Sequence, residues 1–304
     1  MNGLFERRVV LVTGKGGVGR TTLTAALAQS AAAEGKRVLV SEVEELSRQE
    51  HCPLSELFGV RSLSTEPTKL AQNILGVQLQ AEAGAASFLT KLFKVETLSR
   101  LALRTNVLLR IMQAGPSLHE MGIFYHLLSL LEETLDNGEP RHELILIDMP
   151  ATGHTLALTE LPQILTRLVS RGPVAEALAQ GQAILNNPRT GTACVVTIPE
   201  PLPVSESLEL MDGLKKTGMD VGCVLVNRFP TVSFSPEEAA AILGFEGVKQ
   251  RAGFAEFSRN QRAQTSLTRL QAHTNVPIAI LPEVSAASSD LVELLAAQLS
   301  EARP

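Results

Sequence analysis

Short, uninterrupted runs of apolar residues recur along the chain, and longer stretches with helical periodicity separate them. The first run, Val9–Thr13, is rich in β-branched residues and is followed by glycines. The stretch Thr21–Glu34 is rich in alanine and leucine and stops at Gly35, as helices commonly do. The next run is Arg37–Ser41. A strand, a helix and a strand in this order form a βαβ unit, which predicts a parallel sheet with a right-handed crossover.

Four later runs repeat the apolar pattern of a strand that is buried on both faces. They are Leu144–Ile147, Ala193–Thr197, Gly222–Val226 and Val276–Leu281. Helical segments lie between them, so the pattern predicts a doubly wound, mostly parallel α/β sheet of about six to eight strands. A length of 304 residues fits one such domain, residues 1–304, with room for insertions.

Two regions depart from this alternation and indicate helical insertions in the sheet domain. Residues 54–133 contain no run typical of a strand, which predicts a helical insertion subdomain. A second, smaller helical insertion is predicted over residues 231–274, with helices at Glu237–Leu243 and Gln261–Ala272. The first insertion includes Phe88–Met112, an apolar stretch with basic residues at intervals.

Composition narrows the classes of function. Hydrophobic residues make up 44% of the chain and charged residues 19%, enough for a large core. The net charge of −5 gives no support to nucleic acid as a partner. Three distant cysteines, Cys52, Cys194 and Cys223, form no C-x-x-C motif, which favours a reducing compartment over a zinc ribbon or redox pair. The sequence lacks a signal-peptide pattern and a membrane-spanning run, so we expect a cytoplasmic protein without an integral membrane segment.

The strongest chemical signal is a glycine-rich segment between the first predicted strand and helix, the context that a phosphate-binding loop requires. Glycines allow a tight turn that presents backbone N–H groups to an anion, and the following helix adds its N-terminal donors. Thr21 offers a hydroxyl to Mg²⁺, a cation that prefers oxygen ligands. The predicted nucleotide-binding residues are Gly14, Lys15, Gly16, Gly17, Val18, Gly19, Arg20, Thr21 and Thr22.

One position departs from the general pattern G-x-x-x-x-G-K-[ST], because Arg20 stands where lysine is usual. The charge is retained, but a compact ammonium is replaced by a larger planar guanidinium with a different geometry. The start of the loop, with Lys15 directly after Gly14, resembles the deviant Walker A loop of a dimerising branch of P-loop ATPases. That resemblance implies a dimer in which Lys15 reaches the nucleotide of the partner subunit.

A second landmark is the apolar run that ends at Asp148, where P-loop enzymes carry a carboxylate for Mg²⁺ or its water shell. Residues Asp148–Leu156 resemble the D-x-x-P-T-G-H-T-L segment of ArsA-type anion-pump and tail-anchored-protein-targeting ATPases, with Ala151 where proline is common. In that family the segment is switch II, which senses the γ-phosphate. The resemblance implies ATP and Mg²⁺ as cofactors, with Thr21 and Asp148 holding the metal.

A third landmark lies towards the C-terminus. Val196–Glu206 and Val224–Arg228 resemble the family's P-E segment and strand-end asparagine, which implies that Asn227 hydrogen-bonds the adenine edge. Leu281–Val284 resembles the loop that covers the base and adds Pro282 to the predicted nucleotide-binding residues. The resemblance therefore extends from the first strand to Val284.

The match fails after the second strand, where the family has D-P-A-[HS] and its aspartate orients the attacking water. This chain has Ser41–Ser47 there, and either Glu42 or Glu44 takes the place of the aspartate, depending on the alignment. The expected catalytic residues are Lys15, Asp148 and one of these glutamates. With Arg20 this makes two changes at the hydrolytic centre, so we expect nucleotide binding with slow turnover. The clustered cysteines that bind arsenite or zinc in the two named branches are absent.

These observations predict an ATP- and Mg²⁺-dependent ATPase switch that couples nucleotide state to a client or partner protein. It would be a homodimer or a heterodimer with a paralogue. Phe88–Met112 could dock a client helix, although packing within the subdomain explains the same residues. A non-hydrolysing regulatory subunit, a surface-positioning partition-type ATPase and an amidotransferase- or synthetase-type enzyme remain alternatives. The basic residues of the insertion leave open a peripheral link to a membrane.

Overall fold

The computed structural model describes residues 3–44, 52–93, 116–150, 173–232, 234–244, 253–286 and 288–301. Within these residues an eight-stranded sheet has the order β3-β4-β2-β5-β1-β6-β7-β8. The strands are β1 (Val9–Gly14), β2 (Val38–Val43), β3 (Thr68–Ala71), β4 (Ile74–Leu79), β5 (Leu144–Asp148), β6 (Gly191–Thr197), β7 (Val221–Phe229) and β8 (Ile278–Pro282). All neighbouring pairs are parallel except β3 and β4, which confirms the predicted doubly wound, mostly parallel α/β fold.

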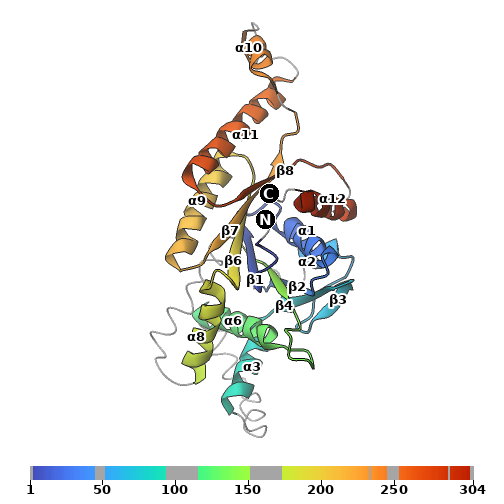
Figure 1. Cartoon of the computed structure of the whole chain (residues 1–304), viewed down its shortest axis with the longest axis vertical. Helices are drawn as coiled ribbons and strands as arrows, with labels where there is room; N and C mark the ends of the chain where they lie inside the picture. Colours follow the sequence, from blue (N-terminus) through green and yellow to red (C-terminus); the bar gives the residue numbers. More distant parts are fainter. Residues whose placement is uncertain are drawn as a thin grey trace.

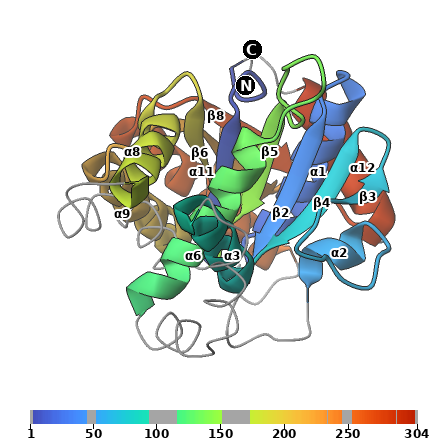
Figure 2. The same cartoon turned by 90° about the horizontal axis from the view of Figure 1, so that it is seen from below.

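Helices cover both faces of this sheet, as Figure 1 and Figure 2 show. One face packs against α1, α2 and α12, and the other against α6, α8, α9 and α11. The described helices are α1 (Arg20–Ala33), α2 (Pro53–Leu57), α3 (Ala81–Phe93), α6 (Pro116–Glu132), α8 (Pro173–Asn186), α9 (Pro201–Lys216), α10 (Pro236–Gly244), α11 (Phe254–His273) and α12 (Ser288–Glu301).

The central strand β1 explains the first uninterrupted apolar run of the sequence. Val9 and Leu11 belong to the core on one face of the sheet, and Val10 and Val12 belong to the core on the other. Successive side chains of a strand point to opposite faces, so a strand that is covered on both sides needs apolar residues at every position.

The prediction that residues 54–133 lack strands is wrong, because β3 and β4 lie within this range and complete one edge of the sheet. In β4, Gly76 and Gln78 interrupt the buried apolar positions. A Cβ at Gly76 would overlap the side chains of Leu63 and Leu70, so a β-branched residue here would displace them. The apolar run is therefore absent although the strand is present.

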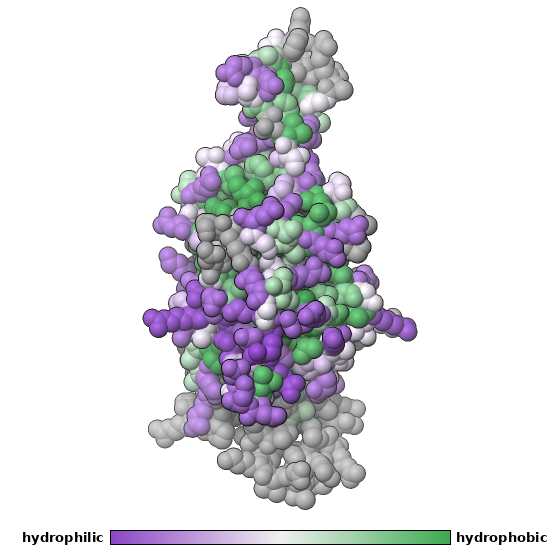
Figure 3. Space-filling model, turned by 45° about the vertical axis from the view of Figure 1, so that its right-hand side comes forward, coloured by the Kyte–Doolittle hydropathy of each residue, from purple (hydrophilic) through white to green (hydrophobic). Residues whose placement is uncertain are grey.

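Helices α3 and α6 lie in the rest of the described part of this region. In the region 231–274, α10 and α11 confirm the two predicted helices, although α11 begins at Phe254 rather than at Gln261. Helix α10 has no buried residue in the described structure and forms the projecting tip at the top of Figure 1 and Figure 3. None of the described helices is long and apolar enough to cross a membrane.

Helices α3 and α6 cross at a contact between two glycines. A Cβ built on Gly84 of α3 would overlap the carbonyl oxygen of Gly122 in α6, and a Cβ on Gly122 would overlap the backbone of Ala81. Beside this crossing, Nδ1 of His126 accepts a hydrogen bond from the Gln80 N–H (3.1 Å). Burial lowers the pKa of His126, in keeping with the neutral ring that an acceptor nitrogen requires. These contacts hold α6 against the start of α3, directly after β4.

Replacing Gly84 with alanine is expected to lower the free energy of unfolding by about 1–3 kcal/mol, as methyl groups inserted into close contacts do. Helix propensity acts in the opposite direction, since it favours alanine over glycine by about 1 kcal/mol. Gly244→Ala, at the exposed end of α10, is the matched control, because nothing described lies within 4 Å of a Cβ there. Urea denaturation measures both variants, and a Gly84→Ala protein as stable as the unmodified chain would contradict the close crossing.

Candidate phosphate-binding site

The glycine-rich loop lies at the carboxyl end of β1, between β5 and β6 in the middle of the sheet. It joins the end of β1 at Gly14 to the start of α1 at Arg20. Gly14, Gly17 and Gly19 have φ values of 151°, 83° and 94°, a region that favours glycine. A Cβ on Gly14 would also overlap the Val196 carbonyl oxygen of β6. The conformation of the loop therefore depends on these glycines, as a backbone anion cradle requires.

A hydroxyl and a carboxylate meet directly beneath this loop. Oγ1 of Thr21, in the first turn of α1, donates a hydrogen bond to Oδ2 of Asp148 at the end of β5 (2.6 Å). Asp148 is buried, with 6% of its surface exposed. Mg²⁺ takes oxygen ligands and keeps several waters, usually beside one or two carboxylates and substrate phosphates. The two residues predicted to hold the metal thus lie together, and their donor atoms fit Mg²⁺.

The side chain of Arg20 explains how arginine is accommodated in a loop that usually carries lysine. Its Nη1 donates hydrogen bonds to the carbonyl oxygens of Gly14 (2.7 Å) and Pro150 (2.8 Å). The planar guanidinium offers several N–H donors in a fixed geometry, which suits two acceptors on different segments. Arg20 therefore ties the start of the phosphate loop to the residues that follow Asp148.

Lys15 is paired within its own chain. Its Nζ lies 2.5 Å from Oε1 of Glu206 in α9, and both side chains are about one-third exposed, at 39% and 32%. Glu206 ends the segment Val196–Glu206, and no local pattern points to a role for it. Its proximity follows from the sheet order, because β6 neighbours β1 and α9 begins just after β6. To reach a partner subunit, Lys15 would have to leave this ion pair.

The two candidate glutamates after the second strand have different partners. Glu42 is the register partner of Asp148 on the adjacent strand, and its carboxylate accepts hydrogen bonds from Cys52 Sγ (2.7 Å) and the Leu54 N–H (3.3 Å). Burial, and next the hydrogen bond to Glu42, raises the pKa of the Cys52 thiol, so the thiol remains protonated and donates. Glu44 is half-buried just after β2. Its backbone N–H donates a hydrogen bond to the Leu79 carbonyl oxygen.

The residues expected near the base come from the next two strands. Asn227, near the end of β7, is 6% exposed and donates from Nδ2 to the Val18 carbonyl oxygen (2.9 Å). Pro282 is half-buried at the end of β8 and is the register partner of Phe229. The structure thus brings Asn227 against the phosphate loop, a contact that no sequence motif predicts.

Several predicted features lie outside the described residues. They are Ala151–His154 of the predicted switch, Glu45–Ser47 of the segment after β2, and residues 94–112 of the candidate client surface. The backbone of Phe88–Phe93 belongs to α3, but its side chains lie outside the described part.

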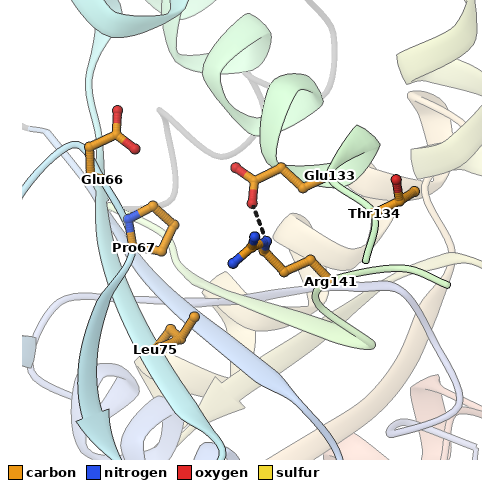
Figure 4. A pocket seen from close by; sticks show the side chains of 6 residues that line it. All are labelled: Glu66, Pro67, Leu75, Glu133, Thr134 and Arg141. Carbon is orange, nitrogen blue, oxygen red and sulfur yellow. Dashed lines mark ion pairs between the residues drawn. The ribbon is translucent and has the colours of Figure 1, made fainter. Parts of the chain in front are cut away.

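A cavity of about 410 Å³ lies at the other ends of the strands, near the starts of β4 and β5 (Figure 4). Arg141 and Glu133 both line it and form an ion pair, with 3.3 Å between Nε of Arg141 and Oε2 of Glu133. Burial raises the pKa of Glu133, and the Arg141 charge opposes this shift. Because Asp148 and the glycine loop lie at the carboxyl ends of the strands, this cavity is separate from the candidate site.

A glycine loop between a central strand and a helix, with a threonine–aspartate pair beneath it, defines a P-loop nucleotide-binding protein. The model of the ArsA-type anion-transporting ATPase family matches residues 7–173 and 170–239. The chain therefore belongs to this family and is an ATPase.

Relatives with assigned names agree with this membership. ATPase BagA of Mycobacterium tuberculosis is 30% identical over 238 residues, which cover 77% of this chain and 68% of that protein. A protein of Aquifex aeolicus, provisionally named as an arsenical pump-driving ATPase, is 26% identical over 249 residues, or 73% and 80% of the two chains. ATPase ASNA1 homolog 1 of Paramecium tetraurelia is 25% identical over 160 residues, or 52% and 44%.

Proposed function

We propose that this ATPase is a slowly hydrolysing, Mg²⁺-dependent dimeric switch that couples its nucleotide state to the binding of a client or partner protein. The observation that carries this proposal is that three segments meet: the start of α1 after the phosphate loop, the end of β5, and the residues that follow β5. Thr21 contacts Asp148, and Arg20 contacts the carbonyl oxygen of Pro150, two residues further along. A nucleotide at the loop would therefore act directly on the start of the predicted switch.

Each residue of the site has a proposed role in this reaction. Thr21 and Asp148 would hold Mg²⁺, which supplies charge neutralisation at the phosphates when it is bound. The loop from Gly14 to Thr22 would orient the phosphate chain through its backbone N–H groups and the start of α1. Lys15 from the partner subunit would add positive charge, and Glu42 or Glu44 would orient water.

Slow turnover is proposed because two components of the hydrolytic centre are already engaged. Arg20 donates to two backbone carbonyls, and the carboxylate of Glu42 accepts hydrogen bonds at the start of α2. Nη1 of Arg20 and Oε2 of Glu42 would have to exchange these partners for the whole side chain to turn towards phosphate or water. Such a rearrangement makes the active arrangement a minor state, which lowers the rate without preventing binding.

Calorimetry with ATP and ADP, paired with a phosphate-release assay on the same protein, tests this proposal. We expect Mg²⁺-dependent binding of both nucleotides and phosphate release well below the enzyme median of about 10 per second. Binding without release would favour the alternative, a regulatory subunit paired with a more active paralogue. Release at ordinary enzyme rates would contradict slow turnover, and absence of binding would contradict the proposed nucleotide site.

The dimer and the client are further parts of the same proposal. The chain would pair with a second copy or a paralogue across the face that carries Lys15, and we place this complex in the cytoplasm. The helical part of residues 54–133, which begins with α3 after strand β4, would change its client contacts when the nucleotide is hydrolysed. Sedimentation with ADP and with a non-hydrolysable ATP analogue measures the first step, and equal masses in both states would contradict it.

A further inference from the structure

The end of β7 carries a local irregularity next to the phosphate loop. The register between β7 and β8 shifts between Val226 and Phe229, as at a β-bulge. Within this shift Arg228 has a φ of 56°, a conformation that is uncommon for a residue with a side chain. Bulges occur often beside functional sites, where they redirect a side chain. Asn227 lies within this shift, directly before Arg228.

The amide of Asn227 makes two hydrogen bonds with the backbone. Its Nδ2 donates to the carbonyl oxygen of Val18 in the phosphate loop (2.9 Å), and its Oδ1 accepts from the Arg228 N–H (3.0 Å). The second bond fixes the orientation of the amide, so that its nitrogen rather than its oxygen faces Val18. Both Asn227 and Val18 are buried, at 6% and 2% exposed, where polar groups need partners.

The phosphate loop has a glycine where the Asn227 amide approaches it. Gly19, the residue after Val18, has a φ of 94°, and a Cβ built there would overlap Nδ2 of Asn227. A trans peptide is planar, so its C=O and the next N–H point in opposite directions. Holding the Val18 carbonyl towards Asn227 therefore directs the Gly19 N–H to the other side of the loop.

We propose that Asn227 is a positioning residue that holds the Val18–Gly19 peptide in the orientation needed to bind the phosphate chain. The inference rests on the proposed nucleotide site and adds a role to one of its residues. The family resemblance implied that Asn227 reads adenine. The two roles differ in their ligands, because loss of base reading affects only adenine, whereas loss of loop positioning affects every triphosphate.

Binding of three Mg²⁺-complexed ligands to the full chain separates these roles: ATP, inosine triphosphate and tripolyphosphate, which has no base. For Asn227→Ala we expect the affinities for all three to fall by a similar factor, about tenfold, for the lost hydrogen bond and the unpaired carbonyl. The ratio of ATP to inosine triphosphate affinity should stay unchanged. A purely structural contact would lower stability without changing this set of affinities.

Asn186 provides a matched control at the amino ends of β6 and β7, the opposite ends of the strands from the phosphate loop. Its Nδ2 also donates to a backbone carbonyl, that of Thr217 (3.2 Å), and it also lies beside a glycine with positive φ, Gly218. Asn186→Ala is expected to change the urea midpoint of the ligand-free protein but none of the three affinities. If Asn227→Ala does not fold, as judged by the same midpoint, Asn227→Ser takes its place.

The inference is overturned if the Asn227 variant loses affinity for ATP alone and binds the other two ligands as before. It is also overturned if all three affinities remain at their original values. Failure of the unmodified chain to bind any of the three would instead contradict the proposed nucleotide site, and this inference with it. The two failures are therefore distinguished by the behaviour of the unmodified protein.

Discussion

Replacing Asp148 with asparagine is expected to lower phosphate release by about 100- to 1,000-fold, the usual effect of removing one charge-stabilising group. Asparagine has nearly the same shape, and its amide oxygen can still accept the hydrogen bond from Thr21 Oγ1. In the unmodified chain this hydroxyl oxygen lies 2.6 Å from the Asp148 carboxylate. Asparagine carries no negative charge, however, and so binds Mg²⁺ poorly. We expect nucleotide affinity to fall less than the rate does, since the backbone of the glycine loop is unchanged.

Asp220→Asn is the matched control for this prediction. Oδ2 of Asp220 also accepts a hydrogen bond from a threonine, Thr192 (3.0 Å), but at the amino ends of β6 and β7. Its replacement should leave both binding and phosphate release unchanged. A steady-state phosphate assay over a range of Mg²⁺ concentrations measures both variants. Equal rates for Asp148→Asn and the unmodified chain would exclude Asp148 as a metal-holding residue.

Replacing Lys15 with alanine is expected to reduce turnover by about 100-fold or more, because a positive charge at the phosphates is removed. If Lys15 acts in the partner's site, mixing Lys15→Ala subunits with Asp148→Asn subunits should restore activity. Each mixed dimer then contains one complete site, with Asp148 from one subunit and Lys15 from the other. After random assortment about one quarter of the unmodified rate should return, as expected for a two-fold dimer.

The ion pair of Lys15 provides the control for that experiment. Glu206→Gln removes the charge that holds Lys15 at 2.5 Å within its own chain. Turnover should then be at least as high as in the unmodified chain, because Lys15 is released to act across the interface. Two inactive variants that stay inactive when mixed would show that Lys15 serves its own subunit. Gel filtration of the mixture verifies that the subunits have exchanged.

The sequence predicted the central part of the fold because burial on both faces leaves a clear signature. Strands β1, β2, β5, β6 and β7 show nearly continuous apolar runs, and the phosphate loop follows the first of them. Strand β4, which lies next to the edge strand β3, escaped prediction because Gly76, packed against Leu63 and Leu70, interrupts its apolar residues. Glycine has no side chain, so Gly76 contributes nothing to the apolar pattern by which a strand is predicted.

The candidate site was predictable where a motif is local and unpredictable where it depends on tertiary contacts. Thr21 lies in the first turn of α1 and Asp148 ends β5, two elements with clear sequence patterns, and the sheet order brings them together. The contact between Asn227 and Val18 joins positions 209 residues apart and lies at a register shift between β7 and β8. Asparagine at a strand end is compatible with many partners, so only the fold identifies this one.

The two edges of the sheet bear on how copies of this chain can associate without aggregating. On one edge β3 is short, carries an exposed Lys69 and is irregular beside it. On the other, β8 starts directly after Pro277 and ends with Pro282, and proline offers no N–H to a further strand. Charged, irregular and proline-bounded edges discourage strand addition between molecules. If copies of the chain assemble reversibly through the surface that carries Lys15, strand addition between molecules would rarely compete with that assembly, even at high protein concentration.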